Sequence, residues 1–296
     1  MLSILIPTYN YNVYPLACQL EKQAIDAQIE FEIICFDDGS KSSVNNENNK
    51  INSLTNSKFK ALEKNIGLSN NRNALVDASK YENILFIDGD SVLIDNQFIM
   101  RYLKALEEKP DVIYGGRIHP NKVEPDRKLR WKYGKKIEDL NSKQRNRNIY
   151  KCVLFNNTLI SKRVFNQIGF EKSITQYGHE DTIFAYKLSL IKASILHIDN
   201  AVLHNDIDLN PIYLDKTKKG IENLNLIYNT ELIEPSFVTF LTYFESLKKF
   251  KLNYVFAYLY KIFQNVFVNN LTSKNPSLFV FNVFRLSYFC YINLNE

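Results

Sequence analysis

The chain has 296 residues, of which 45% are hydrophobic and 23% charged, and its formal net charge is +5. These values are ordinary for one large globular domain, or for one domain with an extension. The basic excess is too small and too scattered for a nucleic-acid-binding protein, but it favours a phosphate-bearing ligand or an anionic membrane surface.

Short apolar runs alternate with segments of helical periodicity over the first 115 residues. Apolar runs that end in polar or turn residues predict buried strands, and apolar residues at helical spacing predict helices. The expected strands are 2–6, 31–36, 59–62, 83–87 and 112–115, and the expected helices are 14–28, part of 41–56, 68–79 and 97–108. This alternation predicts an α/β fold, with a mainly parallel sheet flanked by helices.

The second half of the chain has a different character. Residues 119–150 are rich in Lys, Arg and Asn, with Trp131 and Tyr133 among them, and predict a mobile basic loop or a loosely packed helix. Strand-like patterns resume at 151–156, 158–161 and 194–203, with a helix at 181–191. From about residue 212 the pattern is helical and is divided by Pro235. We therefore expect a catalytic or binding domain over 1–230 and a helical C-terminal extension over 231–296.

Three of the expected strands end in polar clusters. The clusters are Pro7, Thr8, Tyr9 and Asn10; Asp37, Asp38, Gly39 and Ser40; and Asp88, Gly89 and Asp90. Ligands of an open parallel sheet bind at the carboxyl ends of its strands, so we expect these clusters to meet along one edge. Each acidic pair could alone be a solvated turn. Their repetition at successive strands favours a ligand site.

Asp88, Gly89 and Asp90 carry the strongest signal for a metal. Two carboxylates one residue apart can point into one space, and the glycine between them allows a ligand to approach the backbone. Oxygen ligands suit Mg²⁺ or Mn²⁺, which commonly bridge carboxylates to a diphosphate. His204, at the end of a later strand, is a candidate further ligand, because imidazole binds Mn²⁺ well.

A second centre lies around residues 177–181, where Tyr177 and Gly178 precede His179, Glu180 and Asp181. Acidic residues in the first turn of a helix also serve its dipole. The functional alternative is a general base, because a carboxylate that faces a hydroxyl group of a substrate can remove its proton.

Taken in order, these motifs resemble family 2 glycosyltransferases of the GT-A, Rossmann-like fold over roughly residues 1–210. The motifs are residues 4–10 (ILIPTYN), 37–40 (DDGS), 65–67 (NIG) with 70–73 (NNRN), 88–90 (DGD) and 178–181 (GHED). The resemblance divides the catalytic domain into a nucleotide-sugar-binding half, 1–118, and an acceptor-binding half, 119–230. Two positions differ from many family members, which carry Ala in place of Asn71 and Trp in place of His179.

The resemblance implies a role for each matching residue. Residues of the first three motifs would bind the nucleoside and diphosphate of the donor, with Asp38 on the uracil ring, Arg72 on the ribose-diphosphate side and Asp88 near the ribose. The implied nucleotide-sugar contacts are Pro7, Thr8, Tyr9, Asn10, Asp37, Asp38, Gly67, Arg72, Asp88 and Gly89. Asp90 and His204 would bind the divalent cation, Mn²⁺ or Mg²⁺. Asp181 would be the catalytic base, supported by Glu180.

The implied reaction transfers a sugar with inversion from a nucleotide sugar, expected to be a UDP-sugar, to the hydroxyl of a glycan or lipid-linked acceptor in cell-surface polysaccharide or glycolipid synthesis. Two alternatives stay open. A nucleotidyltransferase would carry a Gly-rich basic loop after the first strand, where this chain has Pro7 to Asn10. A non-catalytic nucleotide-sugar-binding protein would be expected to lack Asp90 or Asp181.

The remaining features concern location and partners. The four cysteines are scattered, the apolar start is too short for a signal peptide, and no apolar run reaches the ~18 residues of a membrane span. We expect a cytoplasmic protein, with peripheral attachment to the inner face of the membrane as an option. The aromatic and basic tail 236–296 predicts a packed helical bundle, a homodimer surface or a platform on an anionic bilayer. Residues 117–147 predict a solvated loop or a lid over the donor.

Overall fold

The computed structural model describes residues 1–176 and 178–295, so Tyr177 of the predicted acidic centre lies outside the described residues. The chain divides into two compact units. The first contains residues 1–118, 139–175 and 180–205, and the second contains residues 119–138, 176–179 and 206–296.

A mixed, mostly parallel seven-stranded sheet forms the centre of the first unit, with the strand order β3-β2-β1-β4-β8-β6-β9. β1 pairs in parallel with β2 and β4, whereas β8 runs antiparallel to both β4 and β6. The strands are β1 (Leu2–Thr8), β2 (Phe31–Asp37), β3 (Ser57–Ala61), β4 (Asn83–Ile87), β6 (Val112–Tyr114), β8 (Asn157–Ser161) and β9 (Ile195–His197). The predicted α/β class is confirmed.

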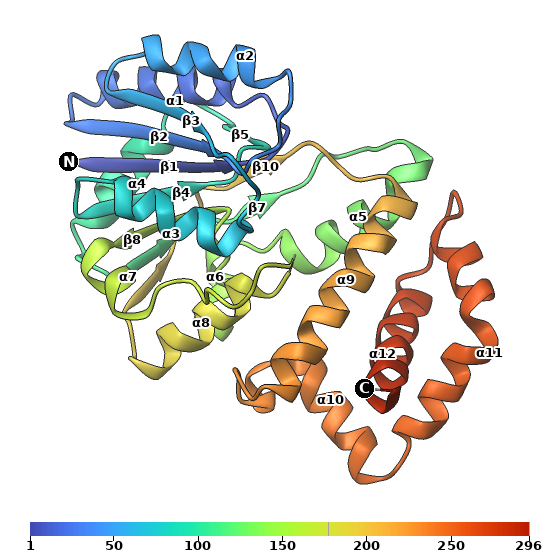
Figure 1. Ribbon diagram of the computed structural model, residues 1–296. Helices are drawn as coiled ribbons and strands as arrows, with labels where there is room; N and C mark the ends of the chain where they lie inside the picture. Colours follow the sequence, from blue (N-terminus) through green and yellow to red (C-terminus); the bar gives the residue numbers. More distant parts are fainter. Residues whose placement is uncertain (177, 296) are drawn as a thin grey trace. The chain divides into compact units, whose positions relative to one another are not determined.

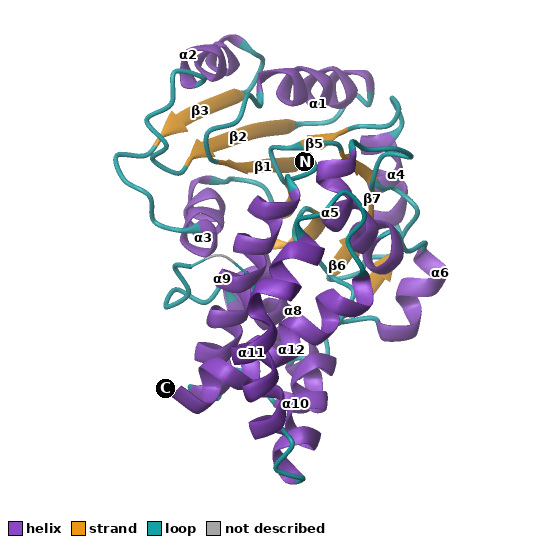
Figure 2. Cartoon of the chain, turned by 90° about the vertical axis from the view of Figure 1, so that its right-hand side faces the viewer, coloured by secondary structure: helices purple, strands orange, loops and turns teal. Residues whose placement is uncertain are grey.

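Both faces of this sheet are covered by helices, because alternate side chains of each strand point to opposite faces. Ile4 and Ile6 pack in one core cluster with α1 and α4, and Leu5 packs in the other with α3, α7 and α8. Figure 2 shows α1 and α2 over one face and α3 over the other. The helices are α1 (Tyr14–Asp26), α2 (Asn45–Asn48), α3 (Leu68–Ala78), α4 (Phe98–Leu106), α6 (Ser142–Arg145), α7 (Lys162–Ile168) and α8 (Glu180–Leu190), with short turns η1 (Asn49–Ser53) and η4 (Asn146–Asn148).

A second, small sheet has three strands, and the first of them follows β4 in the sequence after the turn Asp88–Asp90. Its strands are β5 (Ser91–Val92), β10 (Val202–His204) and β7 (Arg117–Ile118), in that order. His204 pairs with Ser91 in an antiparallel register, and Val202 pairs with Arg117 in a parallel register. Three segments far apart in the chain therefore meet here.

The second unit is helical (Figure 1). It has its own core, which is rich in aromatic residues. α11 and α12 pack against each other, and both contact α9. The elements are η2 (Pro125–Arg127), α5 (Lys128–Tyr133), η3 (Gly134–Glu138), α9 (Asn210–Asn229), η5 (Pro235–Phe237), α10 (Thr239–Lys249), α11 (Asn253–Leu271) and α12 (Leu278–Asn295). The predicted helical C-terminal region is confirmed. None of the described helices has both the length and the mean hydropathy of a membrane-spanning segment.

Two expected strands differ from the structure. Residues 151–156 form turns, because the backbone amide of Phe155 bonds to the Asp181 side chain and not to a neighbouring strand. Residues 194–203 do not form one strand. The buried Asn200 donates a 2.9 Å hydrogen bond to the carbonyl of Phe98, and the chain turns there from β9 of the large sheet to β10 of the small one.

For the basic segment 119–150 the sequence predicts a mobile loop or a loosely packed helix, and the structure agrees with the helical alternative. The segment contains α5, η3 and α6, and two of its arginines, Arg130 and Arg145, are buried and bonded. Arg130 forms two hydrogen bonds to Glu138, at 3.1 and 2.8 Å. Arg145 is 3% exposed and donates to the carbonyl of Ile198 at 2.6 Å. The basic composition of the segment suggests solvated side chains, because composition does not reveal the groups to which Arg130 and Arg145 bond.

Candidate functional site

Arg72 joins two carboxylates that come from distant parts of the chain. It lies on α3, and its side chain is only 1% exposed. Its Nη1 is 2.7 Å from Oδ1 of Asp181, in the first turn of α8, and its Nη2 is 3.0 Å from Oδ1 of Asp88, directly after β4. Burial opposes the charge of Arg72, but the carboxylates of Asp181 and Asp88 raise its pKa above the usual value. The guanidinium therefore stays charged between two anions.

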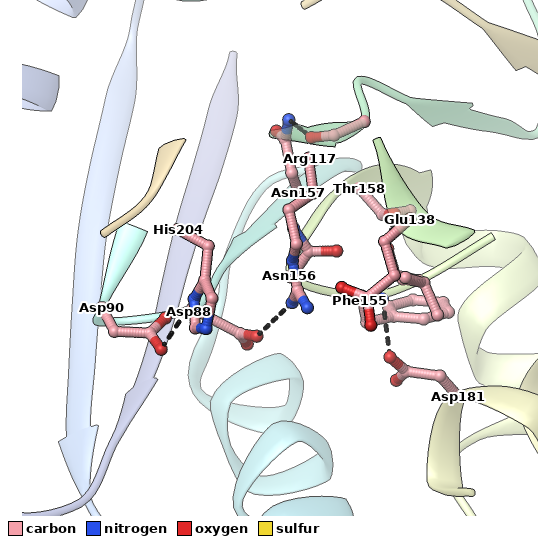
Figure 3. Close-up of polar contacts among 12 residues, drawn as sticks. Asp88, Asp90, Arg117, Glu138, Phe155, Asn156, Asn157, Thr158, Asp181 and His204 are labelled. Atoms are coloured by element: carbon pink, nitrogen blue, oxygen red, sulfur yellow. Dashed lines mark hydrogen bonds and ion pairs between the residues drawn. The ribbon is translucent and has the colours of Figure 1, made fainter. Parts of the chain in front are cut away.

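Aromatic rings and one amide complete this arrangement. The Arg72 guanidinium lies 5.1 Å from the ring centroid of Phe170 and 6.0 Å from that of Phe155, distances at which a cation is attracted to a ring. Oδ2 of Asp181 accepts a 3.1 Å hydrogen bond from the backbone amide of Phe155 (Figure 3). Asp181 is thus bonded through both of its oxygen atoms and has a defined orientation.

The small sheet brings His204 to Asp90. His204 pairs with Ser91, the residue that follows Asp90, and its Nδ1 lies 3.2 Å from Oδ2 of Asp90 (Figure 3). Burial favours protonation of Asp90, but the hydrogen bond and the charge of His204 outweigh burial, and the pKa of Asp90 is lowered. Asp90 is therefore an anion with an imidazole at its side.

This pair fits a divalent cation. Adjacent ligands of an octahedral ion bound at 2.0–2.1 Å are about 3 Å apart, close to the Asp90–His204 separation. Across residues 1–176 and 178–295, no three His, Cys, Asp or Glu side chains gather as a metal site. Mg²⁺ is commonly bound by one or two carboxylates together with substrate phosphates. The donor set therefore suits an ion that arrives with, or is completed by, a diphosphate.

Asp38 and Gly67 shape the chain between β2 and α3. The Asp38 amide bonds to the carbonyl of Thr8 at 2.9 Å, and its carboxylate accepts from the amides of Ile66 at 2.8 Å and Gly67 at 3.0 Å. Burial raises the pKa of Asp38 against these two hydrogen bonds. Gly67 has φ 84°, and a Cβ there would lie 2.8 Å from the carbonyl oxygen of Thr175, so a side chain would clash.

Asp37 is fully buried and joins three segments around it. Its carboxylate accepts hydrogen bonds from the Asn10 amide at 3.2 Å and from the Asn45 side chain at 3.0 Å. The amide and hydroxyl of Ser40 each donate to it at 2.9 Å. These contacts give Asp37 a structural task, which is to fix the loops at the ends of β1 and β2.

The end of β1 lies against the turn that contains the two aspartates. Pro7 and Thr8 are buried, whereas Tyr9 is 59% exposed. A Cβ on Gly89 would lie 2.7 Å from Cγ1 of Val13 and 3.2 Å from Oγ1 of Thr8. Glycine at position 89 therefore allows the two strand ends to approach. Thr8 contacts both the Asp38 amide and this turn, so the predicted clusters do meet at one sheet edge.

Glu180 and Asp181 have different surroundings although they are neighbours. Burial, and next the charge of Asp181, raise the pKa of Glu180 from 4.5 to about 7, while Arg72 opposes this shift. A carboxylate with a pKa near the operating pH is suited to general acid–base catalysis. Asp181 is instead bonded to Arg72 and to the Phe155 amide. The pair thus combines a carboxyl group with a raised pKa, Glu180, and a carboxylate held in a defined orientation, Asp181.

Two residues of this site were not identified from the sequence. Nη2 of Arg117 lies 3.8 Å from Oδ2 of Asp88; burial raises the pKa of Asp88, and the charge of Arg117 opposes that rise and adds to the effect of His204 that lowers the pKa of Asp90. The carbonyl of Asn156 accepts a 3.1 Å hydrogen bond from the Asp88 amide. In the sequence Arg117 stands at the start of a basic segment and carries no signal of its own. For the second contact, the polar pair Asn156 and Asn157 before a strand is the available signal.

Solved structures with a similar fold are distant in sequence. TarS from S. aureus (residues 1–349) in complex with UDP-GlcNAc is 20% identical, with a TM-score of 0.53, over 74% of this chain and 65% of that chain. Another structure of TarS 1–349 is 21% identical, with a TM-score of 0.53, over 77% and 72% of the two chains. The mannosyltransferase PcManGT from Pyrobaculum calidifontis, in complex with GDP-Man and Mn²⁺, is 12% identical over 74% and 61%, with a TM-score of 0.47.

The two TarS comparisons support a shared fold, and the chain covers just under two thirds of the first TarS structure. No curated protein sequence matches the chain. The family comparison is more specific, because residues 3–169, more than half of the chain, match Glycosyl transferase family 2. This segment contains the first four motifs noted above, with the Asp88–Asp90 turn among them. The chain therefore belongs to glycosyl transferase family 2.

Proposed function

We propose that this chain transfers a sugar from a UDP-sugar to a hydroxyl group of a glycan or lipid-linked acceptor, with inversion at the anomeric carbon. The observation that carries the proposal is the meeting of Asp88, Asp90, Glu180 and Asp181 around Arg72 and His204. The carboxyl groups outnumber the guanidinium groups of Arg72 and Arg117, so negative charge at this site would attract a divalent cation, and the bound cation could in turn hold a diphosphate.

In the proposed reaction, the carboxylate pair in the first turn of α8 receives the proton of the acceptor hydroxyl, with Asp181 as the base and Glu180 at its side. The hydroxyl oxygen forms a bond to the anomeric carbon, and the bond from that carbon to the diphosphate oxygen breaks. A cation bound by Asp90 and His204 would supply Lewis-acid stabilisation of the leaving diphosphate. Arg72 orients Asp88 and Asp181, and we propose that it acts through them because its two terminal nitrogen atoms are already bonded.

The donor is tested by the product released. We expect incubation with UDP-, GDP- and dTDP-sugars in Mn²⁺ or Mg²⁺ to give UDP from a UDP-sugar, and chelation to stop this release. Asp90→Asn is expected to lower the metal-dependent release of UDP strongly, because it removes the anionic ligand of the cation. Asp206→Asn, two residues after His204, serves as the matched control. Release of pyrophosphate would identify a nucleotidyltransferase, and binding of a nucleotide sugar with no turnover would identify a non-catalytic protein.

The raised pKa of Glu180 predicts a pH profile. Below a pH of about 7 Glu180 is mostly protonated, and above it the residue is ionised and adds negative charge beside the base. We therefore expect kcat/KM to rise through pH 7 in the wild-type enzyme, and this step to disappear in Glu180→Gln. The measurement is kcat/KM between pH 5.5 and pH 9. An unchanged step in the variant would assign it to another group.

We also propose that α11 rests on an anionic bilayer. Four apolar residues share one face of this helix and are strongly exposed: Val255 (58%), Tyr258 (64%), Ile262 (52%) and Val266 (60%). Residues 236–295 contain six basic side chains and a single acidic one, Glu245. An amphipathic helix with an apolar face and basic surroundings binds an anionic bilayer through burial of its apolar face and through attraction between its positive charges and the lipid headgroups. This charge complementarity favours a membrane surface over a second copy of the same basic chain.

Vesicle flotation tests this contact. The wild-type protein is expected to float with vesicles that contain anionic lipid and to remain unbound with neutral vesicles. The double variant Ile262→Asp and Val266→Asp is expected to lose flotation, and Leu190→Asp, which changes a residue 63% exposed on α8, is expected to keep it. Dimers in light scattering that dissociate in the double variant, without any flotation of the wild type, would show instead that α11 is a self-association surface.

A further inference from the structure

A small pocket in the helical unit has a composition that the proposed donor site does not explain. It has a volume of about 180 Å³ and is lined by segments of α5, α9 and α12 and by residues 178–179. Ligand pockets typically measure about 300–1,000 Å³, so this one suits a single functional group rather than a whole substrate. Its charged lining residues are Lys216 and Arg285, and among the described residues that line it none is acidic.

Arg285 gives the pocket an uncompensated positive charge. Its guanidinium lies 5.6 Å from the ring centroid of Tyr133, 5.3 Å from that of Phe240 and 5.5 Å from that of Phe281. In the part of the chain that the structure describes, Arg285 contacts these rings and forms no ion pair with a carboxylate. Lys216, by comparison, is paired with Asp208 at 2.8 Å. A half-buried arginine that lacks an anion is suited to bind one from outside.

The other walls of the pocket are compatible with an anion. Tyr133 and Tyr213 line it, and a tyrosine hydroxyl can donate a hydrogen bond. Burial, and next the charge of Arg285, lower the pKa of His179 to about 4, so this histidine is neutral at physiological pH and adds no positive charge. Gly220 lies in the interior of α9, where glycine costs helix stability, and a Cβ there would enter open space. A missing side chain at that position leaves room in the pocket.

The pocket is linked to the proposed base by the chain itself. Gly178 and His179 form part of its wall, and Glu180 and Asp181 follow directly in the sequence. The side chain of Asn223 on α9 donates a hydrogen bond to the carbonyl of Gly178, which attaches this segment to the helical unit. A group bound in the pocket therefore contacts the same short segment that carries the two carboxylates.

We infer that this pocket binds an anionic group of the acceptor, a phosphate or a carboxylate, through Arg285. The inference rests on the proposed function and deepens it, because it gives the acceptor a negative charge that Arg285 recognises. A phosphate would point to a lipid-linked or phosphodiester acceptor, and a carboxylate would point to an acidic sugar. The two sources share the same recognition chemistry and are separated by the choice of probe.

Binding of methyl phosphate and of glucuronate to the full-length protein, saturated with UDP and Mn²⁺ so that the donor site is filled, tests the inference. Calorimetry is expected to detect one of the two probes, and Arg285→Gln is expected to raise its dissociation constant by about 10-fold or more, since a charge-assisted hydrogen bond is lost. Gly220→Leu, which fills the pocket and leaves Arg285 in place, is expected to weaken the same probe. Lys274→Gln, an exposed lysine of the same unit, is the control and is expected to bind like the wild type.

Two results would overturn the inference: no binding of either probe to the wild type, or equal binding to the wild type, Arg285→Gln and Gly220→Leu. UDP release from a UDP-sugar by the same wild-type preparation separates this failure from a failure of the proposed function. If UDP is released and neither probe binds, the acceptor pocket is wrong and the transferase proposal stands. If no UDP-sugar is turned over, the proposed function itself fails.

Discussion

Asp181→Asn is expected to lower the rate of sugar transfer by about 10²–10⁴-fold and to leave UDP binding unchanged, because general-base catalysis contributes a factor of that size. An asparagine has the same size as the aspartate and keeps one oxygen that can accept a hydrogen bond from Arg72 or from the Phe155 amide, while its basicity is lost. The measurements are single-turnover transfer and calorimetric titration with UDP. Together they separate chemistry from donor affinity.

Asp77→Asn is the matched control for that variant, because Asp77 is exposed on α3, the helix that also carries Arg72. We expect it to transfer sugar like the wild type. Near-normal transfer by Asp181→Asn would remove Asp181 from the role of base. If Glu180→Gln then lost transfer, the base would be Glu180, whose pKa of about 7 already suits proton transfer.

Arg72→Leu is expected to reduce the free energy of unfolding by about 3 kcal/mol, the lower end of the range for breaking a buried ion pair by removing one partner. The change leaves Asp88 and Asp181 without the guanidinium that lies between them. The loss should shrink as the pH falls, because protonated carboxyl groups need no cationic partner and burial already raises the pKa of Asp88. Urea unfolding at pH 7.5 and at pH 5 provides the measurement.

An exposed pair of the same chemistry gives the control. Arg163 lies 2.6 Å from Asp111, but the arginine side chain is 62% exposed. Exposed ion pairs contribute about 0–1 kcal/mol, so Arg163→Leu should change the unfolding free energy far less than Arg72→Leu does. Equal losses in the two variants would mean that Arg72 is not the centre of a buried charge network.

The N-terminal half of the fold was predictable because its signals are local. β1, β2 and β4 are continuous apolar runs, as expected for strands buried on both faces, and each ends where polar residues begin. β4 was predicted with the bounds that the structure has, Asn83–Ile87. The order of the strands and the antiparallel insertion of β8 were not predictable in this way, since pairing depends on contacts between distant segments.

The errors fall where long-range contacts override local pattern. Val153 and Phe155 alternate like a strand and are buried, but the Phe155 amide bonds to Asp181 and the segment forms turns. The run 194–203 looks continuous, but the buried Asn200 marks a turn between two different sheets. In the segment 119–150, Arg130 and Arg145 have buried partners that no local pattern reveals.

The same distinction applies to the site. The acidic residues were identified because they follow strands or open a helix, which are local features. The link between them was not, because Arg72 on α3 contacts Asp88 and Asp181, which are 16 and 109 positions away along the chain. Arg117 was missed for the same reason, since only the small sheet brings it to Asp88. The individual roles of these residues are proposals, and the variants described above test them.

A crystal structure of the full-length protein with UDP and Mn²⁺ is the most direct test of the central claim, that separate stretches of chain build one site for a nucleotide diphosphate and a cation. We predict an anomalous manganese peak coordinated by Asp90 and His204 and by the diphosphate, with the uracil ring beside Asp38. Manganese or UDP bound elsewhere, with Asp90 and His204 in contact with neither, would contradict this account.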